Sequence, residues 1–573
     1  MSATIHPTLA TNRRLPNIWD GVAIICVLGT LIAFAHVAEG TFVRINAPGA
    51  THVSLDPVHL PEYAVRTILR MFAALVASLL FTFTYGTAAA KSRRAGLVLI
   101  PLLDILQSVP ILGFLSFTVV FFMSLFHGRV MGLELASVFA IFTSQAWNMA
   151  FSLYQSLKTV PADLAEASIS FHLTPWQRFW RLEVPFAVPG LVWNTMMSMS
   201  GGWFFVVASE AVSVGDNTWT LPGIGSYVAL ALQQSNIRAV VYAILAMAVV
   251  ILLYDQLLFR PLVAWSAKFR FETVATVAGP DPWMLRLMRR TRLLSAIADT
   301  IGDLVTFVGG LRLSVDRRRD RGAGRPSHMV DAIWLAVLFL VLIWALRRVA
   351  EFTAGTLGWA DVGKSVLLGI FTMIRVVVLM VLASLLWVPI GVFIGLRPVW
   401  ARRIQPVAQF LAAFPANLLF PPFVLAIVYF RLNANIWLTP LMILGTQWYI
   451  LFNVIAGAAA FPGDLREVAD NFRVGGLLWW RKVIIPGIFA YYVTGAITAS
   501  GGAWNAAIVA EVASWGKTKL TAEGLGAYIA NATSAGDMPR VVLGVAVMAA
   551  FVVLFNRLLW RPLYGYAQRR LAF

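Results

Sequence analysis

The chain has 573 residues, of which 59% are hydrophobic and only 13% are charged. A water-soluble protein of this length needs more charged surface, so the composition excludes a soluble globular protein and indicates a chain whose solvent is largely lipid. The formal net charge of +18 arises from 45 Lys and Arg against 27 Asp and Glu. These cations gather in short loops between apolar runs, which indicates membrane topology and argues against nucleic-acid binding.

Apolar runs of about 20 residues, each long enough to cross a ~30 Å hydrocarbon core, recur along the chain. They predict an all-α polytopic membrane protein with about 12 transmembrane helices. The first six spans are expected at Trp19–Ala38, Thr67–Ala90, Leu97–Phe126, Leu133–Leu157, Phe186–Ala211 and Val240–Leu262. The other six are expected at Val330–Leu346, Leu368–Gly395, Ile404–Phe430, Ile436–Ala460, Gly487–Val512 and Val541–Leu559.

The basic loops set the expected orientation. "NRRLPN" precedes the first span, "KSRR" follows the second and "RPVWARR" follows the eighth. All three lie on one side if the N-terminus is cytoplasmic, and Arg347 and Arg348 after the seventh span are a local exception. Because the sum of loop biases sets orientation, we expect both termini in the cytoplasm.

The chain is expected to divide into a first membrane domain at residues 1–270, a basic cytoplasmic linker at 271–327 and a second membrane domain at 328–573. The linker contains "LLSAIADTIGDLVTFVGGLRL", which carries Asp299 and Asp303 and would invert the second half if it crossed the membrane. We therefore expect an amphipathic helix at the membrane surface, joined to a flexible segment.

The two halves are an internal duplication. At an offset of 301 residues, Pro161, Asp163 and Glu166 correspond to Pro462, Asp464 and Glu467, and the match continues without a gap through Glu210 and Glu511 to Arg260 and Arg561. Upstream, Arg70, Pro101 and Pro110 correspond to Arg375, Pro406 and Pro415 at an offset of 305. Each half has an even number of spans, so the halves are expected to insert in parallel, with a substrate path between them.

The loop between spans four and five reads "PADLAEASISFHLTPWQRFWRLEVPFAVPG", and its repeat reads "PGDLREVADNFRVGGLLWWRKVIIPGIFAYY". Each predicts a helix with an acidic start, a turn, and an aromatic and basic helix that ends at proline. Composition alone fits a helix at the membrane surface with tryptophan anchors equally well.

These loops resemble the EAA loop of ABC-importer permeases, whose pattern is E-A-A-x3-G-x9-I-x-L-P. Glu166, Ala167 and Ser168 match E-A-A in the first copy, and Pro185 ends it. The second copy has Glu467, Val468, Ala469 and Pro486, while the usual glycine is His172 in the first copy and Arg473 in the second. The following segments, "GGWFFVVASEAVSVG" and "GGAWNAAIVAEVASWG", are similar to the nitrate/sulfonate/taurine branch of type I ABC importers.

The resemblance covers most of spans two to six and eight to twelve. It implies a permease in the bacterial inner membrane, with the type I transmembrane fold. Two copies of a cytoplasmic ABC ATPase would dock on the two loops and carry ATP and Mg, so that this chain binds no cofactor and is no enzyme. A periplasmic solute-binding protein would deliver a small anion or an organosulfur or nitrogen solute.

Polar and aromatic residues inside the spans are candidates for the translocation path, although helix–helix hydrogen bonding explains each of them as well. Glu210 and Glu511, near the outer ends of their spans, are interpreted as structural acceptors for backbone N–H groups, with a gating role as the alternative. The path candidates are Gln107, Gln145, Trp147, Asn148, Asn194, Trp203, Asn417, Gln447, Trp448, Trp504 and Asn505.

Two other interpretations remain. An ion-gradient-driven secondary transporter built from parallel repeats explains the duplication, but gives no reason for two cytoplasmic docking loops. A membrane enzyme lacks a catalytic or metal-binding cluster in the sequence. The string "GWADVGKS" at Gly358–Ser365 matches the phosphate-binding pattern G-x-x-x-x-G-K-[ST], but it lies between two apolar spans, so we interpret it as a chance match.

Overall fold

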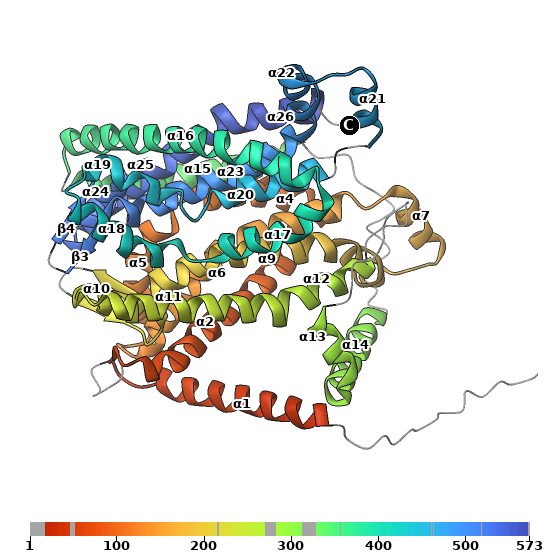
Figure 1. Cartoon of the computed structure of the whole chain (residues 1–573), viewed down its shortest axis with the longest axis horizontal. Coiled ribbons are helices and arrows are strands. Elements are labelled where there is room, and N and C mark those ends of the chain that lie inside the picture. Colours follow the sequence, from red (N-terminus) through yellow and green to blue (C-terminus); the bar gives the residue numbers. More distant parts are fainter. Residues whose placement is uncertain are drawn as a thin grey trace, which may run out of the picture.

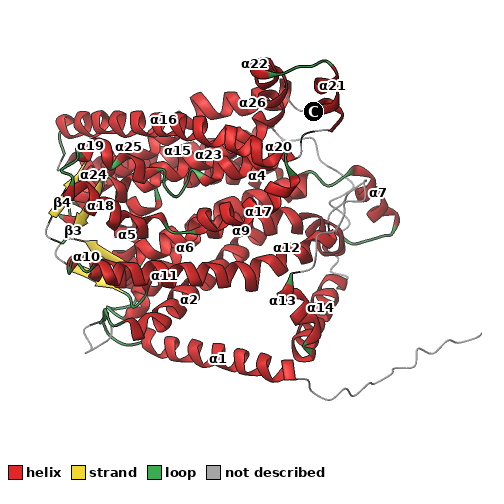
Figure 2. Ribbon diagram, viewed as in Figure 1, coloured by secondary structure: helices red, strands yellow, loops and turns green. Residues whose placement is uncertain are grey.

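The computed structural model of the chain describes residues 18–45, 52–214, 217–269, 282–311, 328–355, 357–459, 461, 463–516 and 518–570. Over these residues the chain is mostly helical, and its long helices run side by side (Figures 1 and 2). Six helical stretches are long and apolar enough to cross a bilayer, and a seventh is present if the bent pair Val399–Ala413 and Ala416–Tyr429 is one span. The prediction of an all-α polytopic membrane protein is confirmed.

The first half and the linker contain fourteen helices and one hairpin among the described residues. The helices are α1 (Ile18–Thr41), α2 (Leu60–Phe81), α3 (Thr87–Lys91), α4 (Arg93–Ser108), α5 (Ile111–Leu125), α6 (Val130–Lys158), α7 (Ala162–Ser170), α8 (Pro175–Arg178), α9 (Val184–Ser209), α10 (Ile224–Gln233), α11 (Ile237–Tyr254), α12 (Arg260–Ser266), α13 (Trp283–Arg290) and α14 (Arg292–Gly310). Strands β1 (Ala211–Val214) and β2 (Asn217–Thr220) pair antiparallel.

The second half repeats this order. Its helices are α15 (His328–Ala354), α16 (Trp359–Gly395), α17 (Pro398–Ala413), α18 (Phe420–Tyr429), α19 (Ala434–Trp437), α20 (Trp448–Ala459), α21 (Gly463–Asn471), α22 (Gly476–Trp479), α23 (Ile485–Ala510), α24 (Leu525–Ser534), α25 (Met538–Phe555) and α26 (Arg561–Arg570). Strands β3 (Val512–Trp515) and β4 (Thr518–Thr521) form the second antiparallel hairpin.

The repeat extends to irregular turns of the helices. Two single π-helical turns of the first half, at Phe179–Glu183 and Asp255–Phe259, recur in the second half at Trp480–Ile484 and Asn556–Trp560. A third, at Thr82–Gly86, has no counterpart in the continuous helix α16. Each recurring pair is separated by 301 residues, which is the offset found in the sequence. Because such turns insert an extra residue into the helical ladder, their recurrence shows that the two halves share detailed backbone geometry.

Three of the expected spans are not continuous helices. The expected span Leu97–Phe126 is divided between α4 and α5, with the break at Val109 and Pro110. The expected span Ile404–Phe430 bends by 82° between α17 and α18, and Ile436–Ala460 is divided among α19, a short 3-10 turn at Thr439–Met442, and α20. Proline lacks the N–H that continues a helix, and Pro110 and Pro415 stand at two of these breaks.

The halves lie parallel. Figure 1 shows α7 and α21 at one end of the bundle, and the β1–β2 and β3–β4 hairpins at the opposite end. Helix α1 begins and α26 ends at the α7 and α21 end. A buried core joins the halves, because Leu115 and Val119 of α5 belong to the same cluster as Ala503 and Ile508 of α23. The hairpins were not expected from the sequence, since each strand has only four residues.

The expected linker helix is present as α14, with the shorter α13 before it. Residues 270–281 and 312–327 of the linker region, where the flexible segment is expected, lie outside the described residues. The boundaries of the two membrane domains stay predictions. The "GWADVGKS" string forms the start of α16, where Gly358 is the N-cap and Asp361 accepts the Gly358 N–H at 3.4 Å. This is a helix that opens a long apolar stretch and not a loop after a strand.

Candidate translocation site and coupling loops

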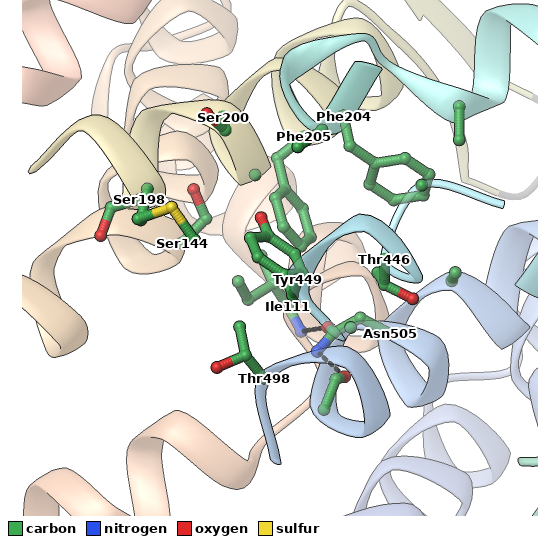
Figure 3. A pocket seen from close by; sticks show the side chains of 18 of the residues that line it. Ile111, Ser144, Ser198, Ser200, Phe204, Phe205, Thr446, Tyr449, Thr498 and Asn505 are labelled. Carbon is green, nitrogen blue, oxygen red and sulfur yellow. Dashed lines mark hydrogen bonds between the residues drawn. The ribbon is translucent and has the colours of Figure 1, made fainter. Parts of the chain in front are cut away.

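A cavity of about 230 Å³ lies between the two halves. Its wall comes from α4, α6 and α9 of the first half, and from α20, α23 and the broken segments around Ala416 and Met442 of the second half. Figure 3 shows Ser144, Ser198 and Ser200 on one side, with Thr446, Tyr449 and Thr498 facing them. The structure therefore has a cavity where the path between the repeats is expected, and its use as a path stays a prediction.

The cavity wall is polar but neutral. Hydroxyl groups come from serine, threonine and Tyr449, amide groups come from Gln107, Asn148 and Asn505, and Phe204 and Phe205 supply aromatic surface (Figure 3). Among the described residues that form this wall, none is charged. A solute here meets hydrogen-bond donors and acceptors without a fixed counter-charge.

Two hydrogen bonds cross between the halves at the points where the spans break. The Ile111 N–H, at the start of α5, donates to Asn505 Oδ1 of α23 at 2.7 Å (Figure 3). Asn417, just after the break in the second half, donates from Nδ2 to the Phe204 carbonyl of α9 at 3.2 Å. Phe204 and Asn505 correspond at the 301 offset. Each contact therefore joins a broken span of one half to the repeat-related helix of the other half, α23 in the first case and α9 in the second.

Four of the path candidates line the cavity: Gln107, Trp147, Asn148 and Asn505. The others make contacts elsewhere. Trp203 and Trp504 are fully buried and pack against Tyr254 and Phe551. The remaining contacts are Gln145 with Ser78, Asn194 with Ser152, Asn417 with Phe204, Gln447 with Trp387, and Trp448 with Trp387.

Sequence reasoning did not select several cavity residues, among them the aromatic residues Tyr449, Phe204, Phe205 and Phe414. Their aromatic type looks like ordinary packing in an apolar helix. The repeat alignment held a signal, because Tyr449 corresponds to the candidate Asn148 and Phe204 corresponds to the candidate Asn505.

Glu210 is the centre of a buried network at the hairpin end of the first half (Figure 1). Its carboxylate accepts hydrogen bonds from Thr67 Oγ1 at 2.7 Å, Arg70 Nη1 at 2.7 Å and the Gly225 N–H at 2.6 Å. The guanidinium of Arg70 also binds Glu134 through Nε and Nη2, at 2.6 and 2.8 Å. The network joins α2, α6 and α9 to the start of α10.

The second half repeats this network with two changes, the first of which is that the backbone donor is Ala527, one residue after the counterpart of Gly225. Glu511 accepts from Thr372 Oγ1 at 2.9 Å, Arg375 Nη1 at 3.0 Å and the Ala527 N–H at 3.0 Å. At the position of Glu134, however, stands Asn435, whose Oδ1 accepts from Arg375 Nη2 at 3.2 Å. One arginine therefore holds two carboxylates in the first half and a single carboxylate in the second.

Glycine is required beside each carboxylate because of space. A Cβ atom on Gly223 would lie 2.3 Å from the Glu210 carboxyl carbon, and one on Gly524 would lie 2.2 Å from a Glu511 carboxylate oxygen. These contacts fit the interpretation of Glu210 and Glu511 as acceptors for the backbone of the following segment. Their alternative role in gating stays a prediction.

The EAA-like loops project from the end of the bundle opposite the hairpins (Figure 1). In α7, Glu166 and Ala167 are exposed while Ser168 is buried, and in α21, Glu467 and Val468 are exposed while Ala469 is buried. Phe171 and Phe472, which correspond at the 301 offset, are each 78% exposed. Each loop thus presents acidic and aromatic surface outward. Pro185 and Pro486 lie in the first turn of α9 and α23.

His172 and Arg473, which replace the usual glycine of the EAA pattern, both have left-handed backbone, with φ of 54° and 51°. This conformation favours glycine, and an L side chain there is strained. The turns after α7 and α21 therefore keep the left-handed backbone conformation that glycine adopts most easily, although neither copy has glycine.

Residues 63–259 and 387–571 each match the family described as "Binding-protein-dependent transport system inner membrane component". Relatives include the bicarbonate transport system permease protein CmpB of Synechocystis sp., which is 27% identical over 176 residues, 31% of this chain and 60% of the relative. The nitrate import permease protein NrtB of Leptolyngbya laminosa is 26% identical over 184 residues, 32% of this chain and 62% of the relative. The glycine betaine/proline betaine transport system permease protein ProW of Escherichia coli is 25% identical over 205 residues, 36% of this chain and 54% of the relative.

The chain therefore spans less than two thirds of the length of these relatives. The family domain, in contrast, occurs twice and covers more than half of the chain. Both matched stretches contain one EAA-like loop, one wall of the cavity and the buried glutamate of one network, Glu210 or Glu511. The chain belongs to the family of binding-protein-dependent transport system inner membrane components, and carries two fused copies of its domain.

Proposed function

We propose that this chain is the complete membrane permease of a type I ATP-binding-cassette importer in the bacterial inner membrane, with both termini in the cytoplasm. Two copies of a cytoplasmic ATPase, which carry ATP and Mg, dock on the loops around Glu166 and Glu467. A periplasmic solute-binding protein delivers the solute at the hairpin end. The observation that carries this proposal is the cavity shared by two parallel halves, each with a loop of the same construction at the same end.

The chemistry of the cavity supports a small polar solute with several acceptor atoms. Hydroxyl and amide groups, such as those of Tyr449, Asn148 and Asn505, can bind oxygens of a small oxyanion or a sulfonate without a fixed cation. The relatives named above are named for bicarbonate, nitrate and betaines. We propose a small anion or an organosulfur or nitrogen solute.

The coupling step follows from the parallel arrangement. When the two ATPase subunits close on ATP, they draw the two loops together and separate the halves at the hairpin end. The bonds of Asn505 with Ile111 and of Asn417 with Phe204, which join the halves at the broken spans, must then break or move. ATP hydrolysis resets the path.

The proposal favours ATP over an ion gradient as the energy source. A proton-driven transporter needs titratable groups that change partners along the path. The cavity wall described above has no charged group, and Glu210 and Glu511 are each bound to an arginine outside it.

The test is transport in proteoliposomes. The chain is purified from its native membrane together with the ATPase and binding protein that accompany it, and uptake of labelled nitrate, bicarbonate, taurine and glycine betaine is measured. We expect uptake of one solute class that requires ATP on the side of α7 and α21 and persists when ionophores collapse ion gradients. Full-rate uptake by the chain without any ATPase would refute the proposal.

A further inference from the structure

The linker helix α14 ends against the first EAA-like loop. The indole N–H of Trp176, in α8, donates to the Val308 carbonyl at 2.7 Å, and Gln177 Nε2 donates to the Gly310 carbonyl at 3.0 Å. These carbonyls belong to the last turn of α14, where a helix has carbonyl groups without a helical partner. Two side chains of the loop therefore cap the end of the linker helix.

Close packing accompanies these bonds. Gly309 is buried, and a Cβ atom there would lie 2.9 Å from Cβ of Trp180, an atom that cannot move without the backbone. The linker helices are attached to the first half at a second point, because Trp283 Nε1 of α13 donates to Gln256 Oε1 at 3.2 Å. Helix α14 contacts α1 as well (Figure 1).

The second loop cannot make the same contacts. At the 301 offset, Trp176 and Gln177 correspond to Leu477 and Leu478, which have no side-chain donor and are 83% and 54% exposed. The N-cap Thr174, which forms a capping box with Gln177, corresponds to Gly475, which has no side chain to cap α22.

Two further differences between the copies also leave the second loop with fewer restraints. Pro175, whose ring fixes φ, corresponds to Gly476, which has φ of 58° and adds backbone freedom. The buried Glu183, which receives Lys91 Nζ at 2.5 Å, corresponds to Ile484. Each of these substitutions removes a restraint from the second loop, although Arg466, which corresponds to Ala165, adds a bond to the Leu396 carbonyl at 3.4 Å.

We propose that α14 is a clasp for the first coupling loop alone, so that the two loops are mechanically non-equivalent. The first loop is held against the linker helix, and the second loop moves with fewer restraints. The effect on ATPase coupling rests on the proposed function, whereas the clasp itself does not.

Hydrogen–deuterium exchange on the full chain in lipid nanodiscs, without any partner, tests the clasp. Amides of residues 174–184 should exchange about tenfold more slowly than those of residues 475–485, the order of one net hydrogen bond. Gly309→Leu should reduce this contrast because it forces α14 away from Trp180, while the restraints from Thr174 and Glu183 remain. The matched control Gly302→Leu, on the same helix, should keep the contrast, since a Cβ at Gly302 meets nothing within 4 Å.

Trp176→Phe serves as a second variant in case Gly309→Leu does not fold, because it removes one donor and keeps an aromatic ring. Equal exchange of the two loops in the parent chain would overturn the clasp, as would a contrast left unchanged by Gly309→Leu or, if that chain does not fold, by Trp176→Phe. With the co-purified ATPase, the variant that reduces the contrast should lower the ratio of solute transported to ATP hydrolysed. An unchanged ratio would overturn the coupling role, and absence of ATP-dependent transport in the parent chain would refute the proposed function while the exchange result stands.

Discussion

Replacement of the buried arginine should destabilise the chain more in the first network, which contains Arg70, than in the second, which contains Arg375. Replacement of Arg70 by methionine leaves two carboxylates, Glu210 and Glu134, with no counter-charge, whereas Arg375→Met leaves only Glu511. Methionine is flexible and fills much of the space that the arginine stem occupies, so the difference reports mainly charge and hydrogen bonding.

Removal of one partner from a buried ion pair costs about 3–5 kcal/mol, which sets the scale for Arg375→Met. The side chain of Arg375 is 13% exposed, and its second contact is the neutral Asn435, so the lower part of this range applies. Arg70 is 3% exposed, and the side chain of its second carboxylate partner, Glu134, is 11% exposed. We therefore expect Arg70→Met to cost about 1–3 kcal/mol more than Arg375→Met.

The assay is the apparent melting temperature of the detergent-solubilised chain, followed by fluorescence-detected gel filtration after heating. The expected order of stability is parent, then Arg375→Met, then Arg70→Met. The double variant Arg70→Met with Glu134→Gln removes one stranded charge and should recover part of the loss. The reasoning is refuted if Arg375→Met is as damaging as Arg70→Met, or if Glu134→Gln does not improve the Arg70→Met chain.

Three other predictions concern the cavity and the loops. Asn505→Leu leaves the Ile111 N–H without its acceptor and should destabilise the chain by about 1–3 kcal/mol, and an unchanged melting temperature in the same assay would contradict this. Tyr449→Phe removes one hydroxyl from the cavity with little change of shape, so the apparent affinity for the transported solute should fall by about tenfold without loss of melting temperature; an unchanged affinity would remove Tyr449 from the site. His172→Gly relieves the left-handed backbone strain and should raise stability by about 1 kcal/mol, whereas His172→Val should lower it; the opposite order in thermal melts would contradict the strain argument.

The sequence was sufficient for the fold class, the duplication and the parallel orientation, because apolar run length and a fixed 301-residue offset are direct physical signals. It was not sufficient for the breaks in three spans. Prolines such as Pro110 were visible, but proline also occurs inside continuous helices here, as with Pro189 in α9 and Pro389 in α16. Only packing against the other half, where Asn505 receives the Ile111 N–H, distinguishes a break from a tolerated proline.

The candidate site was predicted in part for a similar reason. Gln107, Trp147, Asn148 and Asn505 line the cavity, while polar residues of the same type, such as Gln145, form hydrogen bonds inside one half. Residue type does not distinguish a residue that lines the cavity from one that forms hydrogen bonds inside one half, because each is a polar group inside a span. The direction in which each helix face points depends on tertiary packing, which the chain's hydropathy does not encode.

The two halves of the cavity wall differ in chemistry, although they belong to two copies of one domain. The positions of the wall are largely paired by the repeat, yet the paired residues differ in chemistry: Asn148 corresponds to Tyr449, and Phe204 corresponds to Asn505. A chemically two-fold cavity would bind an asymmetric solute equally well in two orientations, whereas this wall presents an amide and an aromatic ring from the first half against a phenol and an amide from the second. The two orientations therefore differ in hydrogen bonding, and a solute with distinct ends occupies one of them. Fusion of the two domains in one chain permits this difference, because a permease built from two identical chains has the same side chain at both positions.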